Sequence, residues 1–272
     1  MTVLFALLAS CIWGAADFLG GLIGKRLPVL SVVSWSQLVG LATVIIAATL
    51  FPAEVAPADL VWGASAGLLG ATGLFAFYKG LAEGRMAVVS PLAGLVSAVV
   101  PLAVGLGLGE RPQPTDWVGI VLAFPAIWLV TAVGGEDWDG EHGASYGVFA
   151  GMGFGLFFVA LAQTGDGSGL WPLVAARAAV GVAALAVARG RPPVPPAGSR
   201  MALVAVGMGD VLANVFLLLA LRSGLLTVVS VLASLYPAVT VLLAVMVLSE
   251  PVRRRQVVGL VLALTAVAMI AA

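Results

Sequence analysis

Long apolar runs, separated by short polar breaks, follow one another along the whole chain. A membrane-spanning helix needs about 20 mostly apolar residues, with a range of roughly 17–25. The breaks carry charges, glycines and prolines, which are typical of turns. The pattern therefore predicts an all-α, polytopic membrane protein with ten transmembrane helices, over residues 2–23, 30–51, 60–82, 87–108, 115–133, 145–164, 170–188, 201–222, 226–248 and 256–272.

The composition makes the lipid bilayer the solvent of this chain. Of its 272 residues, 61% are hydrophobic and only 10% are charged, whereas soluble proteins carry about 25% charged residues. The polar breaks are too short for an added soluble domain. A formal net charge of +0 gives no reason to expect a nucleic-acid partner. The single cysteine, Cys11, excludes a disulfide framework.

The first apolar run contains the segment Leu8-Ala9-Ser10-Cys11, which looks like a lipoprotein cleavage box. A signal peptide also has a basic region before an apolar stretch of roughly 7–15 residues. Here no Lys or Arg precedes Cys11, and the largely apolar run continues to Gly21. We therefore expect the first membrane helix to be retained.

An internal repeat is the strongest signal in the sequence. Sliding the chain by 140 residues superposes 76–132 on 216–272 without a gap. Matched glycine, serine and glutamate positions carry the most weight in so apolar a chain, and they pair Gly84 with Gly224, Ser90 with Ser230, and Glu110 with Glu250. The first two helices of each half match only loosely.

Extending the repeat gives five helices in each half, which we assign to residues 1–138 and 139–272. An odd number of helices per half forces the two halves to insert with opposite orientations. The sequence therefore predicts two inverted five-helix repeats, an arrangement seen in many secondary transporters.

Three short motifs stand out, and two of them, each a turn with a glutamate, precede the last helix of the first and of the second half. They are Trp13-Gly14 in the first helix, Gly109-Glu110-Arg111-Pro112 followed by Gly119, and Ser249-Glu250-Pro251 followed by Gly259. With these motifs the whole chain resembles the EamA-type members of the drug/metabolite transporter superfamily. The resemblance implies a carrier in the bacterial cytoplasmic membrane, most often an exporter of amino acids or other small metabolites. It leaves the substrate open, and the charged termini usual in such carriers are absent here.

Three charged side chains lie at membrane depth. A charge at the centre of a membrane helix costs about 2.5–3.5 kcal/mol on insertion scales, so Asp17, Arg177 and Asp210 are candidates for the transport path. Asp17 shares a helix face with Trp13, and Asp210 shares one with Asn214. Asp17 and Arg177 lie about 9 and 10 Å deep, at opposite membrane faces. We expect them not to touch in one state, with Asp210 able to alternate between them.

Each of these charges also has a structural interpretation. Asp17 could pair with Lys25 or Lys79 near the same helix end, and Asp210 could be a polar clamp. Arg177 could capture a substrate carboxylate, or it could form a fixed ion pair with Asp210. The sequence alone leaves these alternatives open.

Further polar and aromatic residues are secondary candidates for a pocket lining. They are Trp13, Trp35, Gln37, Tyr78, Gln163 and Tyr236. Single aromatic residues in membrane helices are more often interface anchors or packing residues, but Trp35 and Tyr236 are deeper than an anchor should be. Prolines free backbone carbonyls, so Pro91, Pro101 and Pro237 predict that the fourth and ninth helices bend.

Small residues predict close helix packing, which GxxxG spacing permits. Gly147, Gly151 and Gly155 form two such steps in the sixth helix, and Gly63 and Gly67 form one in the third. We expect these faces to pack within one monomer, so that the protein is a monomer or a weak dimer.

No enzyme, cofactor or metal motif is present in the sequence. The glycine-rich segment at residues 165–169 has no preceding strand and no following Lys, so it is not a phosphate loop. His142 lies in an acidic loop that is better explained by solvation than by cation binding. We therefore expect neither a resident cofactor nor a metal.

The distribution of basic residues conflicts with the resemblance over orientation. Ten Lys and Arg residues lie in or beside the breaks that follow odd-numbered helices, against Arg111 and Arg222 on the other side. The positive-inside rule then places both termini outside, whereas the resemblance implies both termini inside. We adopt the family topology, which a C-terminal reporter active only in the periplasm would overturn.

Together these patterns predict a secondary carrier that works by alternating access. Its substrate site would lie near mid-membrane, lined by the first, second, third, seventh, eighth and ninth helices. Export of a small metabolite such as an amino acid is the preferred function, and proton coupling is compatible with the buried charges. Uptake of a sugar-like nutrient is the alternative within this class. Outside the class of transporters, the alternatives are a membrane-embedded lipid-modifying enzyme and a non-transporting scaffold.

Overall fold

The computed structural model describes residues 1–24, 27, 29–83, 86–131, 141–187, 189, 194–248 and 253–272. All the regular secondary structure in those residues is helical, and it lies in α1 (Thr2–Gly24), α2 (Val29–Thr49), α3 (Pro57–Glu83), α4 (Met86–Gly107), α5 (Pro114–Thr131), α6 (Glu141–Ala162), α7 (Trp171–Val187), α8 (Arg200–Ser223), α9 (Leu226–Ala233), α10 (Tyr236–Leu248) and α11 (Arg254–Ala271), with the short 3-10 turns η1 (Asp166–Ser168) and η2 (Ala197–Ser199). Helices α9 and α10 form one apolar span, Leu226–Leu248. Among the described residues, eight helical spans are long and apolar enough to cross a membrane, while α2 and α7 contain the shorter apolar stretches Ser34–Thr49 and Trp171–Ala186. The predicted all-α polytopic fold with ten long helical segments is therefore confirmed.

The 140-residue frame extends through all five helices of each half. Adding 140 to the bounds of α5 gives those of α11, and adding it to the bounds of α3 gives 197–223, which η2 and α8 fill. The bounds of α1 and α2 map onto those of α6 and α7 within two residues at each end. The first two helices of each half, which match only loosely in sequence, thus keep the same register in the structure.

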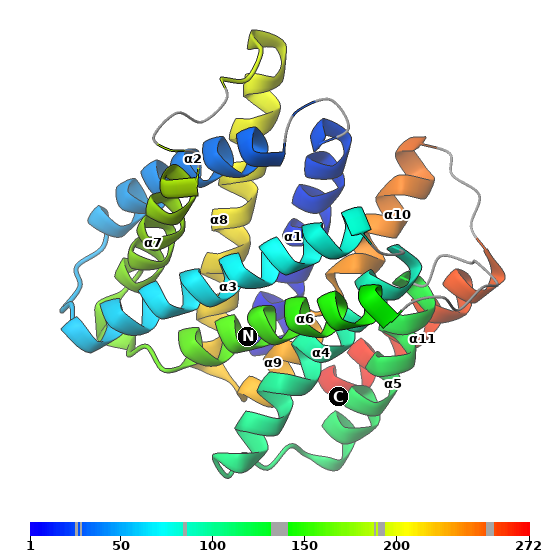
Figure 1. Cartoon of the computed structure of the whole chain (residues 1–272). Helices are drawn as coiled ribbons and strands as arrows, with labels where there is room; N and C mark the ends of the chain where they lie inside the picture. The colour runs from blue at the N-terminus through cyan, green and yellow to red at the C-terminus, as the bar shows by residue number, and fades with distance from the viewer. Residues whose placement is uncertain are drawn as a thin grey trace.

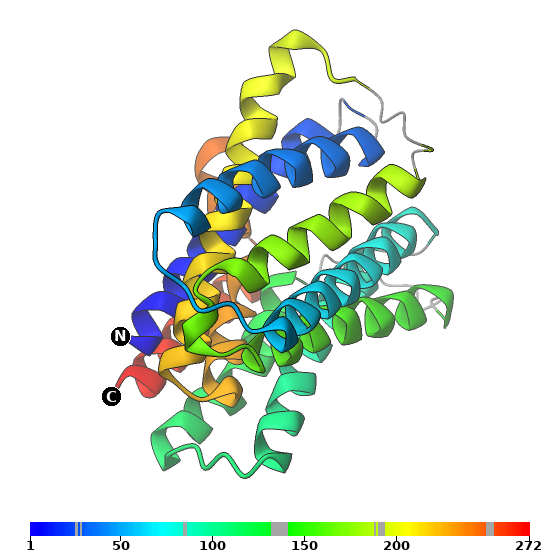
Figure 2. The ribbon, with the colours of Figure 1, turned by 90° about the vertical axis from the view of Figure 1, so that its left-hand side faces the viewer.

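Helix packing follows a two-fold pattern. Helix α1 packs on α8 while its repeat equivalent α6 packs on α3, and α2 packs on α8 while α7 packs on α3. Helices α5 and α11, which are equivalent to each other, pack together (Figure 1). Both chain ends lie on the same side of the bundle (Figure 2). These pairings are what an inverted repeat produces, because each contact recurs with the two halves exchanged.

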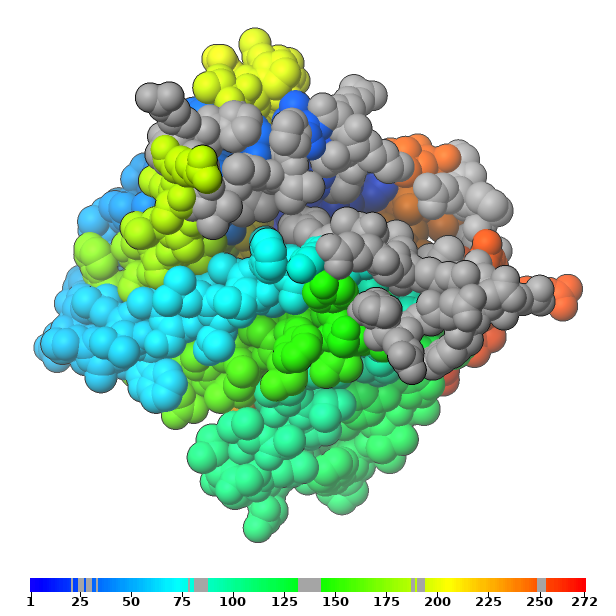
Figure 3. All heavy atoms as spheres, in the orientation of Figure 1, coloured from blue at the N-terminus to red at the C-terminus, as the bar shows by residue number. Residues whose placement is uncertain are grey.

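The outer surface is apolar, as a lipid-facing surface must be. Helices α3 and α6 run side by side and form a continuous face (Figure 3). Val61 and Phe75 on α3 are 65% and 70% exposed, and Phe149 on α6 is 63% exposed. Exposed apolar side chains of this kind are what a helix presents to lipid.

Glycines bring several helices into backbone contact. A Cβ at Gly63 or Gly67 of α3 would overlap backbone atoms of Pro172 or Ala176 on α7. A Cβ at Gly151 of α6 would lie 2.7 Å from the carbonyl oxygen of Ala93 on α4. These glycines therefore pack within the monomer, which is the role that their spacing predicts.

The ninth span is interrupted, whereas the fourth is not. Proline has no backbone N–H and its ring clashes with the carbonyl four residues earlier. Accordingly, Pro237 follows the break between α9, which ends at Ala233, and α10, which starts at Tyr236. Helix α4 continues through Pro91 and Pro101. Of the two helices that we expected to bend, only the ninth span is therefore interrupted.

Candidate functional site

A buried ion pair lies at the middle of the bundle. Arg177 of α7 places Nη1 2.6 Å from Oδ2 of Asp210 on α8. The Arg177 side chain is only 9% exposed, whereas that of Asp210 is 31% exposed. The charge on Arg177 is therefore compensated inside the protein, and one face of the Asp210 carboxylate remains accessible.

The other oxygen of Asp210 accepts two further hydrogen bonds. The indole Nε1 of Trp13 on α1 donates to Oδ1 at 2.9 Å, and Nδ2 of Asn214 donates to the same oxygen at 3.1 Å. Asn214 Nδ2 also donates to the Asp210 carbonyl at 2.6 Å. The carboxylate is thus held in place from α1, α7 and α8, and its orientation is fixed before any ligand binds.

Gln37 of α2 completes the cluster. Its Oε1 accepts a hydrogen bond of 2.6 Å from Arg177 Nη1. Gln37 and Arg177 are 140 residues apart, so they occupy the same position in the two halves. The two halves therefore meet at this contact, and the guanidinium joins α2 to α8.

Asp17 lies beside this cluster on α1. It follows Trp13 by one helical turn, and its carboxylate interacts electrostatically with that of Asp210. Its side chain is exposed, and among the described residues no atom lies within 4 Å of where a Cβ would stand at Gly20, one turn further on. The carboxylate of Asp17 is therefore accessible on the same helix as Trp13, which holds Asp210.

Aromatic rings line one side of the cluster. The ring of Trp13 stacks on Phe158 of α6 with centroids 5.9 Å apart, and it meets Tyr236 of α10 edge-on at 6.4 Å. Phe158 in turn contacts Phe157. Sequence reasoning missed both phenylalanines, although the 140-residue frame places Phe157 opposite Asp17 and could have indicated them.

The structure brings together most of the residues expected at a site, but not all of them. Trp35 lies away from the cluster, beside a cavity between α2 and α8, and Gln163 lies at the end of α6, where it donates to the carbonyl of Val159. The side chains of Tyr78 and His142 are outside the described part of the chain. His142 itself lies in the first turn of α6 rather than in a loop. The gathered set is Trp13, Asp17, Gln37, Arg177, Asp210, Asn214 and Tyr236.

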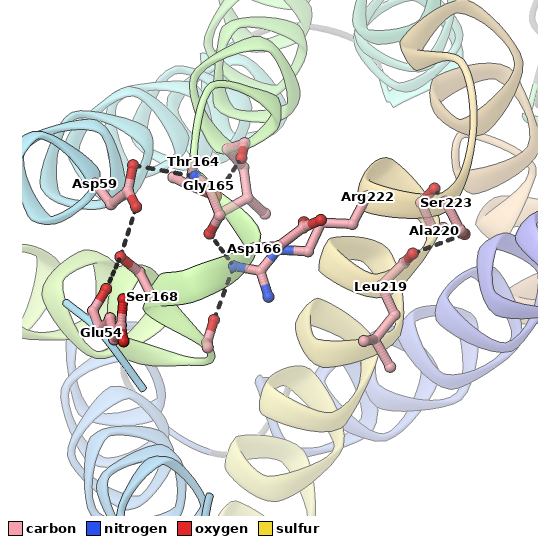
Figure 4. Close-up of polar contacts among 12 residues, drawn as sticks. Glu54, Asp59, Thr164, Gly165, Asp166, Ser168, Leu219, Ala220, Arg222 and Ser223 are labelled. Carbon is pink, nitrogen blue, oxygen red and sulfur yellow. Dashed lines mark hydrogen bonds and ion pairs between the residues drawn. The ribbon is translucent and has the colours of Figure 1, made fainter. Parts of the chain in front are cut away.

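A polar network closes the end of the bundle that holds the chain termini. Arg222 at the end of α8 donates from Nη2 to the carbonyls of Gly165 and Gly169 at 2.8 and 2.9 Å, and its Nε lies 3.3 Å from Asp166 (Figure 4). Asp59 at the start of α3 accepts from Ser168 at 2.5 Å. The loop between α6 and α7 is thereby tied to both α3 and α8.

The same end holds a helix cap made by a glutamate. The carboxylate of Glu110 accepts hydrogen bonds from the backbone N–H groups of Leu226 and Thr227 at 2.7 and 2.9 Å. These are the first residues of α9, so Glu110 satisfies donors that lack partners within the helix. A negative charge at a helix N-terminus is also favourable.

We expect Glu110→Ala to lower the free energy of unfolding by about 1–2 kcal/mol, since loss of a cap typically costs about 0.5–2 kcal/mol. Thermal unfolding of the purified protein in detergent measures this. Glu54→Ala is the matched control, because Glu54 lies at the same end with an exposed side chain. Equal melting temperatures for the two variants would contradict the capping role.

Comparison with known proteins agrees with this architecture. The EamA-like transporter family matches the chain twice, over residues 1–132 and 142–272. The chain belongs to the EamA-like transporter family. It is thus a multi-pass membrane transporter of the drug/metabolite transporter superfamily, as the motifs in the two halves indicated.

Several solved structures share the fold of this EamA-like chain, and one of them can be compared over nearly its whole length. It is described only as "Crystal structure of protein", and it matches with a TM-score of 0.78 over 99% of this chain and 98% of its own length, at 20% sequence identity. A likeness at that identity concerns the fold alone. No curated protein matches the chain.

Chemically, the central cluster of this EamA-like transporter offers both charge signs side by side. Arg177 can hold a carboxylate, Asp17 and Asp210 can hold an ammonium group or a proton, and Trp13 and Tyr236 offer ring faces. Among the described residues, no group of three or more His, Cys, Asp or Glu side chains could hold a metal ion.

Proposed function

We propose that this protein is a secondary carrier that exports a small zwitterionic metabolite, such as an amino acid, across the cytoplasmic membrane of a bacterium. The observation that carries the proposal is the mid-membrane pair of Arg177 and Asp210, in which Asp210 keeps an accessible face. Charged side chains inside a membrane mark substrate and ion pathways. The substrate site comprises Trp13, Asp17, Gln37, Arg177, Asp210, Asn214 and Tyr236.

The chemistry of the pair favours a zwitterion. Removing one partner from a buried ion pair typically costs about 3–5 kcal/mol, because the other charge is left uncompensated. A zwitterion can insert between Arg177 and Asp210 with its carboxylate on the guanidinium and its ammonium group on the carboxylate. No charge is then left without a partner, whereas a simple acid or amine would compensate only one of the two.

Alternating access follows from the asymmetry between two equivalent helix pairs. At the end with the termini, Gly63 lets α3 lie in backbone contact with α7. The equivalent position on α8 is Leu203, whose side chain packs near Val32 of α2. At this position the helices of one pair are in backbone contact and those of the other are separated by a side chain, which supports a carrier whose halves exchange conformations.

Proton coupling is part of the proposal. Asp17 and Asp210 are two carboxylates in electrostatic contact, with one guanidinium, that of Arg177, paired to Asp210. Like charges at close range disfavour the doubly ionised form. A proton can therefore occupy one carboxylate when the ammonium group of the substrate is absent, which links proton movement to substrate movement in opposite directions.

Flux into proteoliposomes tests the proposal. We expect zwitterionic amino acids to exchange at least tenfold faster than amines, carboxylic acids or sugars of similar size, and a pH gradient to drive their accumulation. Comparable flux of uncharged sugars would favour the nutrient-uptake alternative. Absence of flux for every solute by the folded protein would overturn the transport mechanism placed at this cluster. A C-terminal reporter in cells determines the orientation of the protein in the membrane.

A further inference from the structure

A cavity outside the central cluster lies between α2 and α8. It has a volume of about 350 Å³ and is lined by Trp35 and Val39 of α2, by Arg200, Leu203 and Val204 of α8, and by the segment Val194–Pro195. Small-molecule sites typically have volumes of about 300–1,000 Å³. The lining is apolar except for Arg200, so the cavity suits an apolar chain with a charged group at one end.

The cavity faces the bilayer rather than the central cluster. Trp35 and Val39 are followed along the same face of α2 by Ile46, which is 63% exposed. Val204 is followed along α8 by Met208 and Leu212, which are 49% and 47% exposed. Gln37, which contacts Arg177, lies on a different face of α2. An apolar groove thus continues from the cavity along the lipid-facing surface.

Helix geometry gives the groove its polarity. Arg200 is the first residue of α8, and Leu212 lies twelve residues further along, about 18 Å at 1.5 Å per residue. A charge at the start of a membrane helix lies at headgroup level, while the following turns lie in hydrocarbon. The groove therefore runs from the headgroup region into the membrane, as a phospholipid does.

Arg200 places a positive charge at the entrance of the groove. Arg200 forms no ion pair with another side chain in the part of the chain that the structure describes. The segment 189–200 contains three arginines and no acidic residue, and the break before α2 contains Lys25 and Arg26 without an acidic residue. Basic sites between membrane helices favour anionic lipid headgroups.

We propose that the groove between α2 and α8 binds one anionic phospholipid, with its phosphate on Arg200 and an acyl chain along Trp35, Val39 and Val204. Entry occurs from the bilayer, because the exposed apolar stripes on both helices are continuous with it. The acyl chain supplies burial of apolar surface, and Arg200 supplies the preference for a negative headgroup.

Quenching of tryptophan fluorescence tests the site. The protein is reconstituted in vesicles of phosphatidylglycerol and phosphatidylcholine, with brominated acyl chains on one lipid or on the other. We expect stronger quenching by brominated phosphatidylglycerol, reflecting a preference of about fivefold from one arginine contact. Trp35→Phe should remove the excess quenching, because Trp35 is the tryptophan that lines the cavity.

Two variants separate the headgroup contact from the chain contact. Arg200→Gln should abolish the preference for phosphatidylglycerol, and Val204→Phe should weaken quenching by both lipids because it fills the groove. Arg254→Gln is the matched control, since Arg254 is exposed at the start of α11 on the same side. Equal quenching by the two lipids in the wild type would overturn the proposal. A preference retained in Arg200→Gln, or lost equally in Arg254→Gln, would also overturn it.

Discussion

Replacing Asp210 by Asn is expected to abolish substrate transport. The variant leaves the buried Arg177 without a counter-charge and removes the carboxylate that Trp13 and Asn214 orient. Loss of one partner of a buried pair typically costs about 3–5 kcal/mol, which corresponds to a loss of binding by a factor of about 100 or more. Exchange of labelled amino acid in proteoliposomes measures the loss.

A double variant distinguishes a transport defect from a folding defect. In Arg177→Gln/Asp210→Asn neither member of the pair is left as a charge without its partner, so we expect its thermal stability to return close to that of the wild type while transport stays absent. Full substrate flux in Asp210→Asn would show that the pair is outside the path. Flux restored in the double variant would show that the pair has only a structural role.

Gly63→Leu is expected to keep the end with the chain termini from closing and thereby to stop transport. Any side chain at Gly63 would overlap the backbone of Pro172, and overpacking typically costs about 1–3 kcal/mol. Helix α3 must therefore move away from α7. A cysteine placed at Leu173, a residue that is only 3% exposed, reports whether this end is open. The measurement is the rate at which a water-soluble maleimide labels Leu173→Cys in a Cys11→Ser background.

Gly107→Ala is the control for this variant. Gly107 ends α4, and no described atom lies within 4 Å of where its Cβ would stand. We expect Gly107→Ala to leave both labelling and transport unchanged, whereas Gly63→Leu raises the labelling rate at least tenfold. Unchanged labelling together with normal transport in Gly63→Leu would mean that the contact between α3 and α7 is not part of the closure.

The helices and the repeat could be predicted from the sequence because they depend on run length and register. Apolar runs of membrane length give the ten spans, and a few polar matches such as Glu110 with Glu250 set the frame. The same frame also aligns α1 with α6 and α2 with α7, although the sequences of these helices are only loosely similar. Register survives because an added or removed residue would rotate a whole helix face.

The inward face of each helix was harder to predict. In a soluble protein the apolar face of a helix points inward, but here lipid and protein interior are both apolar. Trp35 and Gln37 are two residues apart, and only Gln37 joins the central cluster. A charged residue such as Asp210 can be predicted to face the protein interior, because a charge facing lipid is costly. An apolar residue such as Phe158 can face either lipid or protein, so its direction could not be predicted.

The contact between Gln37 and Arg177 has a geometric consequence for the transport cycle. An exchange of conformation between the two halves maps each of these positions onto the other, so their contact is the same before and after the exchange. The counterpart of Asp210 in the other half is Gly70, so the same exchange changes the surroundings of the Asp210 carboxylate. In the proposed transport cycle, the guanidinium of Arg177 keeps its contact with Gln37, and the carboxylate of Asp210 is the charged group whose surroundings differ between the two states.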